Sequence, residues 1–285
     1  MNKTFALSLF AACVSFAMIG CGAPGDEALD EDERLGTAEQ ALVAEDPPEG
    51  LNHFGARPFW AGDTQAAYRI MGAGPLNRKN GLLPDVTIRM AYRVQVLRNA
   101  IECGLGQDQS VIDPETGVTL FGHWGLARSW MDEALTTSQR RYVTACMAQR
   151  LNAHEMPIPI LLKGRNEEIR TDSDLDLEYP FDESTAWGDL FSSAGPLDDD
   201  DDPPFELFVC SDSDLHDFCH TIPAVPDDRL RYRICDSSPY CGLNLRGPCS
   251  NPAVCTTSST GYPVCDGVIE TVHVQLAAGV CSPAP

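Results

Sequence analysis

The sequence predicts an α+β fold, in which a helix-rich unit with short strands is followed by a disulfide-stapled, β-rich C-terminal module. Two amphipathic helical patterns lie between residues 87 and 151, and apolar segments at residues 157–162 and 268–276 are typical of strands. Eight cysteines crowd the last 76 residues of the 285-residue chain. We therefore expect helical packing in the middle of the chain and covalent bridging at its end.

The first helix is predicted over residues 87–103, where apolar side chains recur at gaps of four, three and four residues. These side chains form one stripe, made of Met90, Val94, Leu97 and Ile101. Gly104 follows the stripe as the expected C-cap. Three basic side chains fall largely off the stripe and are expected on a solvated face, namely Arg89, Arg93 and Arg98.

The second helix is predicted to begin at a cap on Thr137 or Ser138 and to run through Leu151. Before it, the segment VTLFGHWGLA carries strand-forming residues that are broken by Gly122 and Gly125. After it, residues 157–162 predict a short buried strand. The order of helix, strands, helix and strand indicates an α+β unit.

The C-terminal module is predicted to be β-rich and to depend on its cysteines. Residues 235–265 are dense in Pro, Gly, Ser and Thr, so they bury little apolar surface without bridges. The last strand, at residues 268–276, places Val272, Val274 and Leu276 on one face. His273 and Gln275 fall on the opposite face, where His273 is expected to be a surface histidine.

The N-terminus has the features of an export signal. Lys3 is followed by an apolar stretch that is too short for a membrane-spanning helix, so residues 1–20 are predicted to be a signal peptide. The segment Met-Ile-Gly-Cys resembles the lipobox of bacterial lipoproteins, and this resemblance implies that Cys21 is acylated. Gly22 then argues against retention in the inner membrane, which favours the outer membrane. Ordinary secretion, with cleavage after Ala23, is the alternative.

Charge divides the remaining chain. Residues 21–50 form an acidic tether, with ten acids and one arginine among residues 24–50. Residues 51–165 are expected to form the α+β subdomain, residues 166–204 an acidic loop or linker, and residues 205–285 the cysteine-rich β module. The net charge of −22 argues against nucleic-acid binding and against electrostatic docking on an anionic leaflet.

The cysteine count indicates disulfides. Without Cys13 in the signal and Cys21 at the lipid site, an even number remains, as expected for five bridges in an exported chain. Cys103 is expected to pair with Cys146, because each lies late on its helix. The pairing of the others stays open: Cys210, Cys219, Cys235, Cys241, Cys249, Cys255, Cys265 and Cys281. No C-x-x-C pair occurs, which argues against zinc.

Several stretches in the middle of the chain carry a family resemblance. YRVQVLRNAIECGLGQDQSV, FGHWGLARSW, SQRRYVTACMAQRLNAHEMPIPILLKG and AWGDLF look like segments of a set of cysteine-rich lipoproteins and secreted proteins of myxobacterial type. The resemblance covers most of residues 88–285 in the order of its motifs. It implies an envelope location and paired cysteines, and it implies no activity.

Two acidic segments are candidates for cation binding. In DSDLDLEYPFDE, the oxygen-bearing residues follow part of the EF-hand spacing, and the calcium candidates are Asp172, Asp174, Asp176, Glu178 and Glu183. Leu177 replaces the turn glycine and Pro180 occupies a ligand position, so a solvated acidic loop is the alternative. In DSDLHDFCH, a second metal-like group competes with a polar loop: Asp212, Asp214, His216, Asp217 and His220.

Motifs for catalysis are absent from the sequence. It contains no G-x-S-x-G elbow, no H-E-x-x-H and no phosphate-binding loop. The predicted function is an envelope-anchored lipoprotein that acts as a binding, adhesion or structural module, with a protein or glycan of the envelope or exterior as ligand. The membrane is contacted through acyl chains on Cys21, and no cofactor other than calcium is expected. The alternatives are an extracytoplasmic hydrolase with an unrecognised site and a calcium-dependent surface protein.

Overall fold

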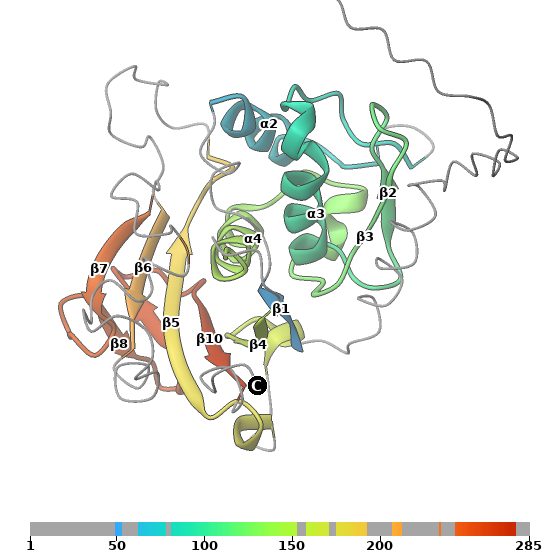
Figure 1. Cartoon of the computed structure of the whole chain (residues 1–285). Coiled ribbons are helices and arrows are strands. Elements are labelled where there is room, and N and C mark those ends of the chain that lie inside the picture. Colours follow the sequence, from blue (N-terminus) through green and yellow to red (C-terminus); the bar gives the residue numbers. More distant parts are fainter. Residues whose placement is uncertain are drawn as a thin grey trace, which may run out of the picture. The chain divides into compact units, whose positions relative to one another are not determined.

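The computed structural model describes residues 49–52, 62–77, 81–152, 158–170, 175–192, 207–212, 234 and 243–277. These residues form helices packed on a mixed sheet, which confirms the α+β class (Figure 1). The predicted signal peptide, Cys21 and nearly all of the acidic tether lie outside the described residues. The last two residues of the expected tether, Glu49 and Gly50, lie in strand β1 (Glu49–Asn52) of the sheet.

The central sheet has the strand order β1-β4-β10-β5-β6-β7. Neighbouring strands are antiparallel, except that β6 and β7 are parallel. Besides β1, the strands are β4 (Ile158–Lys163), β10 (Val272–Leu276), β5 (Phe181–Gly188), β6 (Leu207–Ser211) and β7 (Asn244–Pro248). The last strand of the chain thus lies between strands from the middle of it.

The sheet joins segments that the sequence predicted to be separate. β4 belongs to the expected α+β subdomain, β10 to the expected β module, and the two are hydrogen-bonded neighbours. The expected acidic linker, residues 166–204, contains β5 in the middle of the sheet. The sequence pattern did not reveal this strand, because several of its residues are polar and face the second side of the sheet rather than the apolar core.

Helices cover the first side of the sheet. α4 (Thr137–Gln149) packs against β5 and β10, and α3 (Arg93–Gly104) packs against α4 on the side away from the sheet (Figure 1). α2 (Gly62–Gly72), which the sequence analysis did not predict, adds Tyr68 and Met71 to the same core. Short 3₁₀ turns complete the set at Met90–Tyr92, Arg128–Met131, Glu167–Ile169 and Leu175–Leu177.

The helix starts differ from the predicted ones. α4 is capped by Thr136, one residue before the expected position, because Thr136 and Gln139 form a reciprocal capping box. α3 begins at Arg93, and the 3₁₀ turn before it leaves Met90 56% exposed, so Met90 does not belong to the buried stripe. Arg93 was expected on a solvated face but is fully buried.

Arg93 is buried because an ion pair satisfies it. Its Nε and Nη2 atoms donate to the two carboxylate oxygens of Asp113 at 2.8 and 2.7 Å, and Nη1 donates to the carbonyl oxygen of Val86 at 2.6 Å. Asp113 begins the turn between β2 (Ser110–Ile112) and β3 (Thr119–Phe121). The pair therefore ties the start of α3 to the β2–β3 hairpin.

A close backbone approach also holds this hairpin. A Cβ atom on Gly122 would lie 2.4 Å from the carbonyl oxygen of Gly106, so only glycine fits there. The amide of the next residue, His123, donates to the carbonyl oxygen of Glu102 in α3 at 3.1 Å. The expected break of the strand at Gly122 thus coincides with packing of the hairpin against the end of α3.

A smaller apolar cluster lies on the second side of the sheet. It contains Trp187, Cys210, Val254, Cys255 and Cys265. The last three belong to or flank a hairpin of two short strands, β8 (Cys255–Thr257) and β9 (Pro263–Cys265). This hairpin is the disulfide-stapled part of the β-rich region that the sequence predicted.

Three disulfides join described residues. Cys103–Cys146 connects α3 to α4, as expected from their positions late on two helices. Cys210–Cys249 connects β6 to the end of β7, and Cys255–Cys265 connects β8 to β9. The remaining predicted bridge cysteines, Cys219, Cys235, Cys241 and Cys281, lie outside the described residues.

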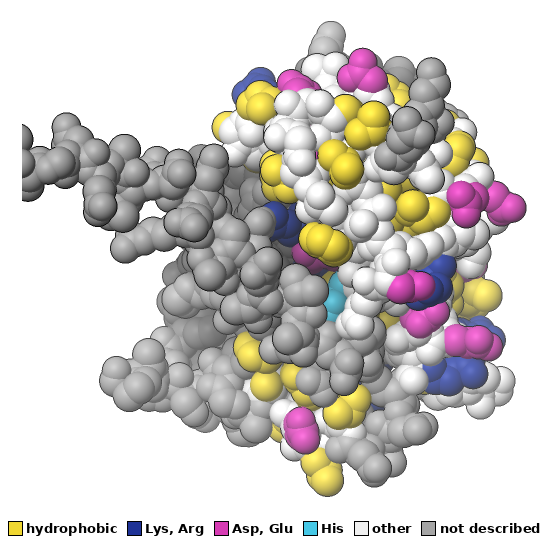
Figure 2. Space-filling view, turned by 90° about the vertical axis from the view of Figure 1, so that its right-hand side faces the viewer, with side chains coloured by type: hydrophobic (Ala, Val, Ile, Leu, Met, Phe, Trp, Pro, Cys, Tyr) yellow, Lys and Arg dark blue, Asp and Glu magenta, His cyan; other side chains and the backbone are white. Residues whose placement is uncertain are grey.

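One face of the molecule is drawn in Figure 2. Hydrophobic side chains lie there in small groups among polar atoms, and acidic side chains lie beside basic ones. Arg128 and Asp108 form an exposed ion pair in the described part of the chain, with side-chain atoms 2.6 Å apart. Among the described residues, no helix is both long and apolar enough to span a bilayer.

Candidate functional site

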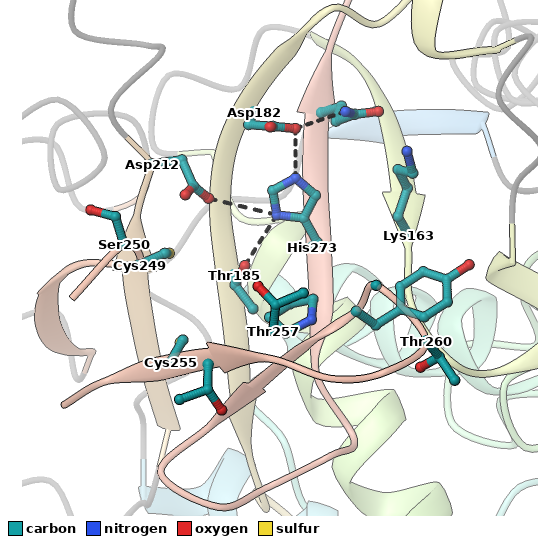
Figure 3. Close-up of a pocket in the computed structure, with 15 residues that line it drawn as sticks. Lys163, Asp182, Thr185, Asp212, Cys249, Ser250, Cys255, Thr257, Thr260 and His273 are labelled. Carbon is teal, nitrogen blue, oxygen red and sulfur yellow. Dashed lines mark hydrogen bonds and ion pairs between the residues drawn. The ribbon is translucent and has the colours of Figure 1, made fainter. Parts of the chain in front are cut away.

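Polar side chains form a row across the second side of the sheet. Lys163 in β4 is the register partner of His273 in β10, His273 is the partner of Thr185 in β5, and Thr185 is the partner of Cys210 in β6. Register partners on neighbouring strands point to the same face. The four side chains therefore lie on the face opposite α4, where the row ends at the disulfide-bonded Cys210, and Figure 3 shows His273 between Thr185 and Lys163.

A β-bulge adds Asp182 to this row. Val274 pairs with Ser184, but the next residue of β10, Gln275, pairs with Asp182, so Glu183 is an extra residue in β5. The extra residue reverses the alternation of β5, and Asp182 therefore shares the face of Thr185 and His273. Without the bulge, the carboxylate of Asp182 would point toward the helices.

His273 is held on both of its ring nitrogens. Its Nε2 atom lies 2.8 Å from Oδ1 of Asp182, and its Nδ1 atom lies 3.1 Å from Oγ1 of Thr185 (Figure 3). When the Nε2 proton is donated to Asp182, Nδ1 accepts the hydroxyl proton of Thr185. The histidine side chain is 15% exposed and Thr185 is buried, so the group lies at the floor of a site that solvent reaches.

Two further charged groups stand beside the imidazole. Oδ2 of Asp212 lies 3.6 Å from Nδ1 of His273, on the opposite ring edge from Asp182 (Figure 3). The backbone amide of Asp212 donates to the carbonyl oxygen of Glu183 at 2.8 Å, which fixes the residue just beyond β6. Lys163 supplies a positive charge from β4, so the site combines donors and acceptors at close range.

The pKa of Asp182 is lowered below its usual range. The main cause is the hydrogen bond from His273, which outweighs the opposing effect of burial, and the hydrogen bond from Gln275 and the charge of Lys163 act in the same direction. Asp182 is therefore ionised at neutral pH. The pocket then presents a carboxylate whose orientation is fixed by two hydrogen bonds.

Gln275 completes the floor of the pocket. Its Nε2 atom donates to Oδ1 of Asp182 at 2.7 Å. Its Oε1 atom is buried and accepts no hydrogen bond from any described residue, and the side chain lines the cavity although the residue is only 8% exposed. A buried acceptor without a donor is costly, which marks this atom as a position for a group from outside the chain.

The β8–β9 hairpin forms the wall of the pocket. It contributes hydroxyl groups, together with the ring of Tyr262, around a cavity of about 600 Å³. The hydroxyl-bearing residues of the wall are Ser250, Thr256, Thr257, Thr260 and Tyr262. The Cys255–Cys265 bridge closes the hairpin, and the Thr271 hydroxyl donates to the carbonyl oxygen of Pro263 at 2.9 Å, which fastens the hairpin beside β10.

The sequence located few of these residues. His273 lies on the predicted face of its strand, but it is a hydrogen-bonded pocket residue, and the expectation of a surface histidine is wrong. Asp212 is the one described member of the predicted metal-like group, since Asp214, His216, Asp217 and His220 lie outside the described residues. Asp182, Thr185 and Gln275 were not singled out, because only the pairing of distant strands brings them together.

The calcium candidates are only partly described. Asp172 and Asp174 lie outside the described residues, as does the side chain of Asp176. Glu178 is exposed, whereas Glu183 is buried at the bulge of β5. Within the described part of the chain, the side chains close enough to share one ion are those of Cys210, Cys255 and Cys265, and all three are in disulfides.

His123 is a second histidine of the described residues and packs on an aromatic ring. Its ring lies edge-on to that of Trp124, with 4.4 Å between the ring centroids. His123 follows β3 in the first half of the fold, whereas the pocket lies on the second side of the sheet. Of these two histidines, only His273 lies in the described pocket.

Comparison of the chain with protein-family models, with curated proteins and with solved structures gives no match. The chemistry of the pocket therefore has to be inferred from its own side chains.

Proposed function

We propose that this chain is an exported, membrane-anchored lipoprotein that binds a ligand in the pocket around His273. The observation that carries the binding function is the pocket itself, in which five polar side chains converge on one cavity: Lys163, Asp182, Asp212, His273 and Gln275. Pockets with a few convergent polar groups are the usual form of small-ligand sites.

The export part of the proposal rests on the sequence and on the bridges. The apolar N-terminal segment, the lipobox-like Cys21 and the acidic tether form a signal, an anchor and a spacer. The described disulfides agree with an oxidising compartment, because such bridges form and persist there. A tether of this kind would hold the pocket away from the membrane surface.

Mass spectrometry of the protein purified from its host tests the anchor. The expected product begins at Cys21 and carries a diacylglyceryl group, and the Cys21→Ala variant lacks that mass. A chain that retains its initiator methionine, carries no lipid and has free thiols would contradict the export proposal.

Sedimentation tests the binding function. The mature protein in detergent is mixed with lipid-extracted envelope material, and the fraction that sediments is measured. We expect Asp182→Asn to lower this fraction, because the substitution keeps the shape of the side chain and removes its charge. Thr119→Val, on the exposed side of β3, is the matched control and should sediment as the wild type does. Equal retention of both variants would contradict the pocket as the binding site.

Hydrolysis is a second candidate function, favoured by one observation. Asp182, His273 and Thr185 form a hydrogen-bonded chain of carboxylate, imidazole and hydroxyl, as nucleophilic catalysis requires. The hydroxyl belongs to a residue that is 1% exposed, which keeps it from a substrate carbonyl and favours the binding function. Labelling of Thr185 by an acyl-transfer probe, lost in Thr185→Val, would favour hydrolysis over ligand binding.

A further inference from the structure

We infer that the His273 pocket takes a neutral, polyhydroxylated ligand, that is, an uncharged carbohydrate unit. This inference rests on the proposed binding function and specifies its ligand class. It follows from three features of the pocket: the balance of its charges, an acceptor that lacks a donor, and a wall of hydroxyl groups.

The charges in the pocket disfavour an ionic ligand. Asp182 and Asp212 flank the imidazole, so an anionic ligand would face two carboxylates in a chain whose net charge is −22. Lys163 lies on the strand beside His273 and acts on Asp182, so it offsets one of the two carboxylates, and a cationic ligand would also face its ammonium group. A hydroxyl group avoids both conflicts, because it donates to a carboxylate and accepts from an ammonium.

Gln275 supplies the most specific indication of a ligand. Its amide nitrogen is used by Asp182, which fixes the orientation of the amide and leaves Oε1 as a buried acceptor without a donor. Asp182 adds a second acceptor beside it, since its side chain is 41% exposed. Acceptors on these two register-paired residues can take the protons of two hydroxyl groups of one ligand.

The hairpin wall suits a sugar ring. Thr256, Thr257 and Thr260 are exposed at the rim and offer hydroxyls that donate and accept. The partly exposed ring of Tyr262 offers an apolar surface for the C–H face of a sugar. The cavity volume of about 600 Å³ falls within the range of small-ligand pockets, which is roughly 300–1,000 Å³.

Calorimetric titration of the full mature protein, with its disulfides intact, tests the ligand class. The neutral probes are cellotriose, maltotriose and N,N′,N″-triacetylchitotriose, the anionic probe is trigalacturonate, and the cationic probe is spermidine. We expect at least one neutral trisaccharide to bind with a Kd of about 1 mM or tighter. Asp182→Asn should weaken it about tenfold or more, since a hydrogen bond to a charged group is lost.

Thr257→Val provides a second variant that does not disturb the floor of the pocket. This rim substitution should also weaken the neutral ligand, whereas Thr119→Val on β3 should leave its affinity unchanged. Absence of binding by all three neutral probes to the folded protein would overturn the inference. So would binding that neither pocket variant alters.

The two proposals fail in distinguishable ways. Pocket-dependent binding of spermidine or trigalacturonate, without any neutral probe, would overturn the carbohydrate class and leave the binding function standing. Pocket-dependent sedimentation with envelope material, without binding of the neutral probes, would likewise overturn the carbohydrate class and support the binding function. Sedimentation that is independent of Asp182, together with no binding of any probe, would overturn both.

Discussion

The Nε2 atom of His273 lies 2.8 Å from Oδ1 of Asp182, although the regular alternation of β5 would turn this carboxylate to the other side of the sheet. The bulge at Glu183 makes the contact possible by shifting the register by one residue. A local irregularity of one strand thus builds the polar floor of the pocket. Ala186 of the same strand faces the core under the helices, and Trp187 faces the smaller apolar cluster on the second side.

The pKa of Asp182 leads to a prediction about acid stability. A carboxyl whose pKa is lower in the folded than in the unfolded chain stabilises the fold above about pH 4, and this contribution is lost as the pH falls through the lowered pKa. Solvent screens the effect because the side chain is 41% exposed. Asp182→Asn should therefore reduce the slope of the unfolding free energy against pH below about pH 4.

Urea titrations at a series of pH values measure this slope. Asp132→Asn, at an exposed turn, serves as the control and should follow the wild type. If Asp182→Asn and the wild type lost stability in parallel throughout the acid range, the carboxylate would not have the assigned partner.

Breaking the buried ion pair of Arg93 and Asp113 is expected to destabilise the fold strongly. Asp113→Asn removes the buried counter-charge of Arg93 and leaves only the half-exposed Glu115 beside the guanidinium, so we expect the free energy of unfolding to fall by about 3 kcal/mol. Glu115 also contacts Arg93, but its side chain is 47% exposed, and Glu115→Gln should cost about 1 kcal/mol or less. Similar losses in the two variants, measured by urea unfolding, would contradict the assigned burial.

Adding a side chain at Gly122 is expected to cause a steric clash that the same change at Gly117 does not. Gly122→Ala places a Cβ atom against the backbone of Leu105 and Gly106, and we expect a loss of about 2–3 kcal/mol. Gly117→Ala is the matched control, because its Cβ would meet open space and only its φ of +76° opposes the change, at about 1 kcal/mol. Thermal unfolding compares the two, and an equal loss would refute the close approach.

We expect the contribution of each disulfide to the free energy of unfolding to increase with the length of the loop that it closes. Removing Cys103–Cys146, whose cysteines are 43 residues apart, should cost about 4 kcal/mol in the chain-entropy model. Removing Cys255–Cys265, with a separation of 10 residues, should cost about 3 kcal/mol. Paired Cys→Ala variants measured by urea unfolding check the order, and a larger loss for the shorter loop would contradict it.

Local sequence patterns predicted the elements whose structure is set by their own residues. The helix that ends at Gly104 and the strand around Val274 follow from the spacing of apolar side chains, and the α+β class follows from their order. Arg93 was misplaced because its counter-charge is 20 residues away, at Asp113, and helical periodicity carries no information about that partner.

The pocket was not predictable in the same way. Asp182 lies in a stretch of acids that reads as a solvated loop, and its partner His273 is 91 residues further along the chain. Only the strand pairing and the bulge bring them together. The bulge also breaks the period of two by which β5 would have been recognised as a strand.

The imidazole resonances of His273 provide the most direct test of the account. They are assigned by their loss in His273→Gln and followed by NMR while soluble oligosaccharides from the host envelope are added to the mature protein. We expect the His273 resonances to shift until the binding site is saturated, whereas those of His123, packed on Trp124, should not shift. Saturable binding that leaves His273 unchanged would contradict it.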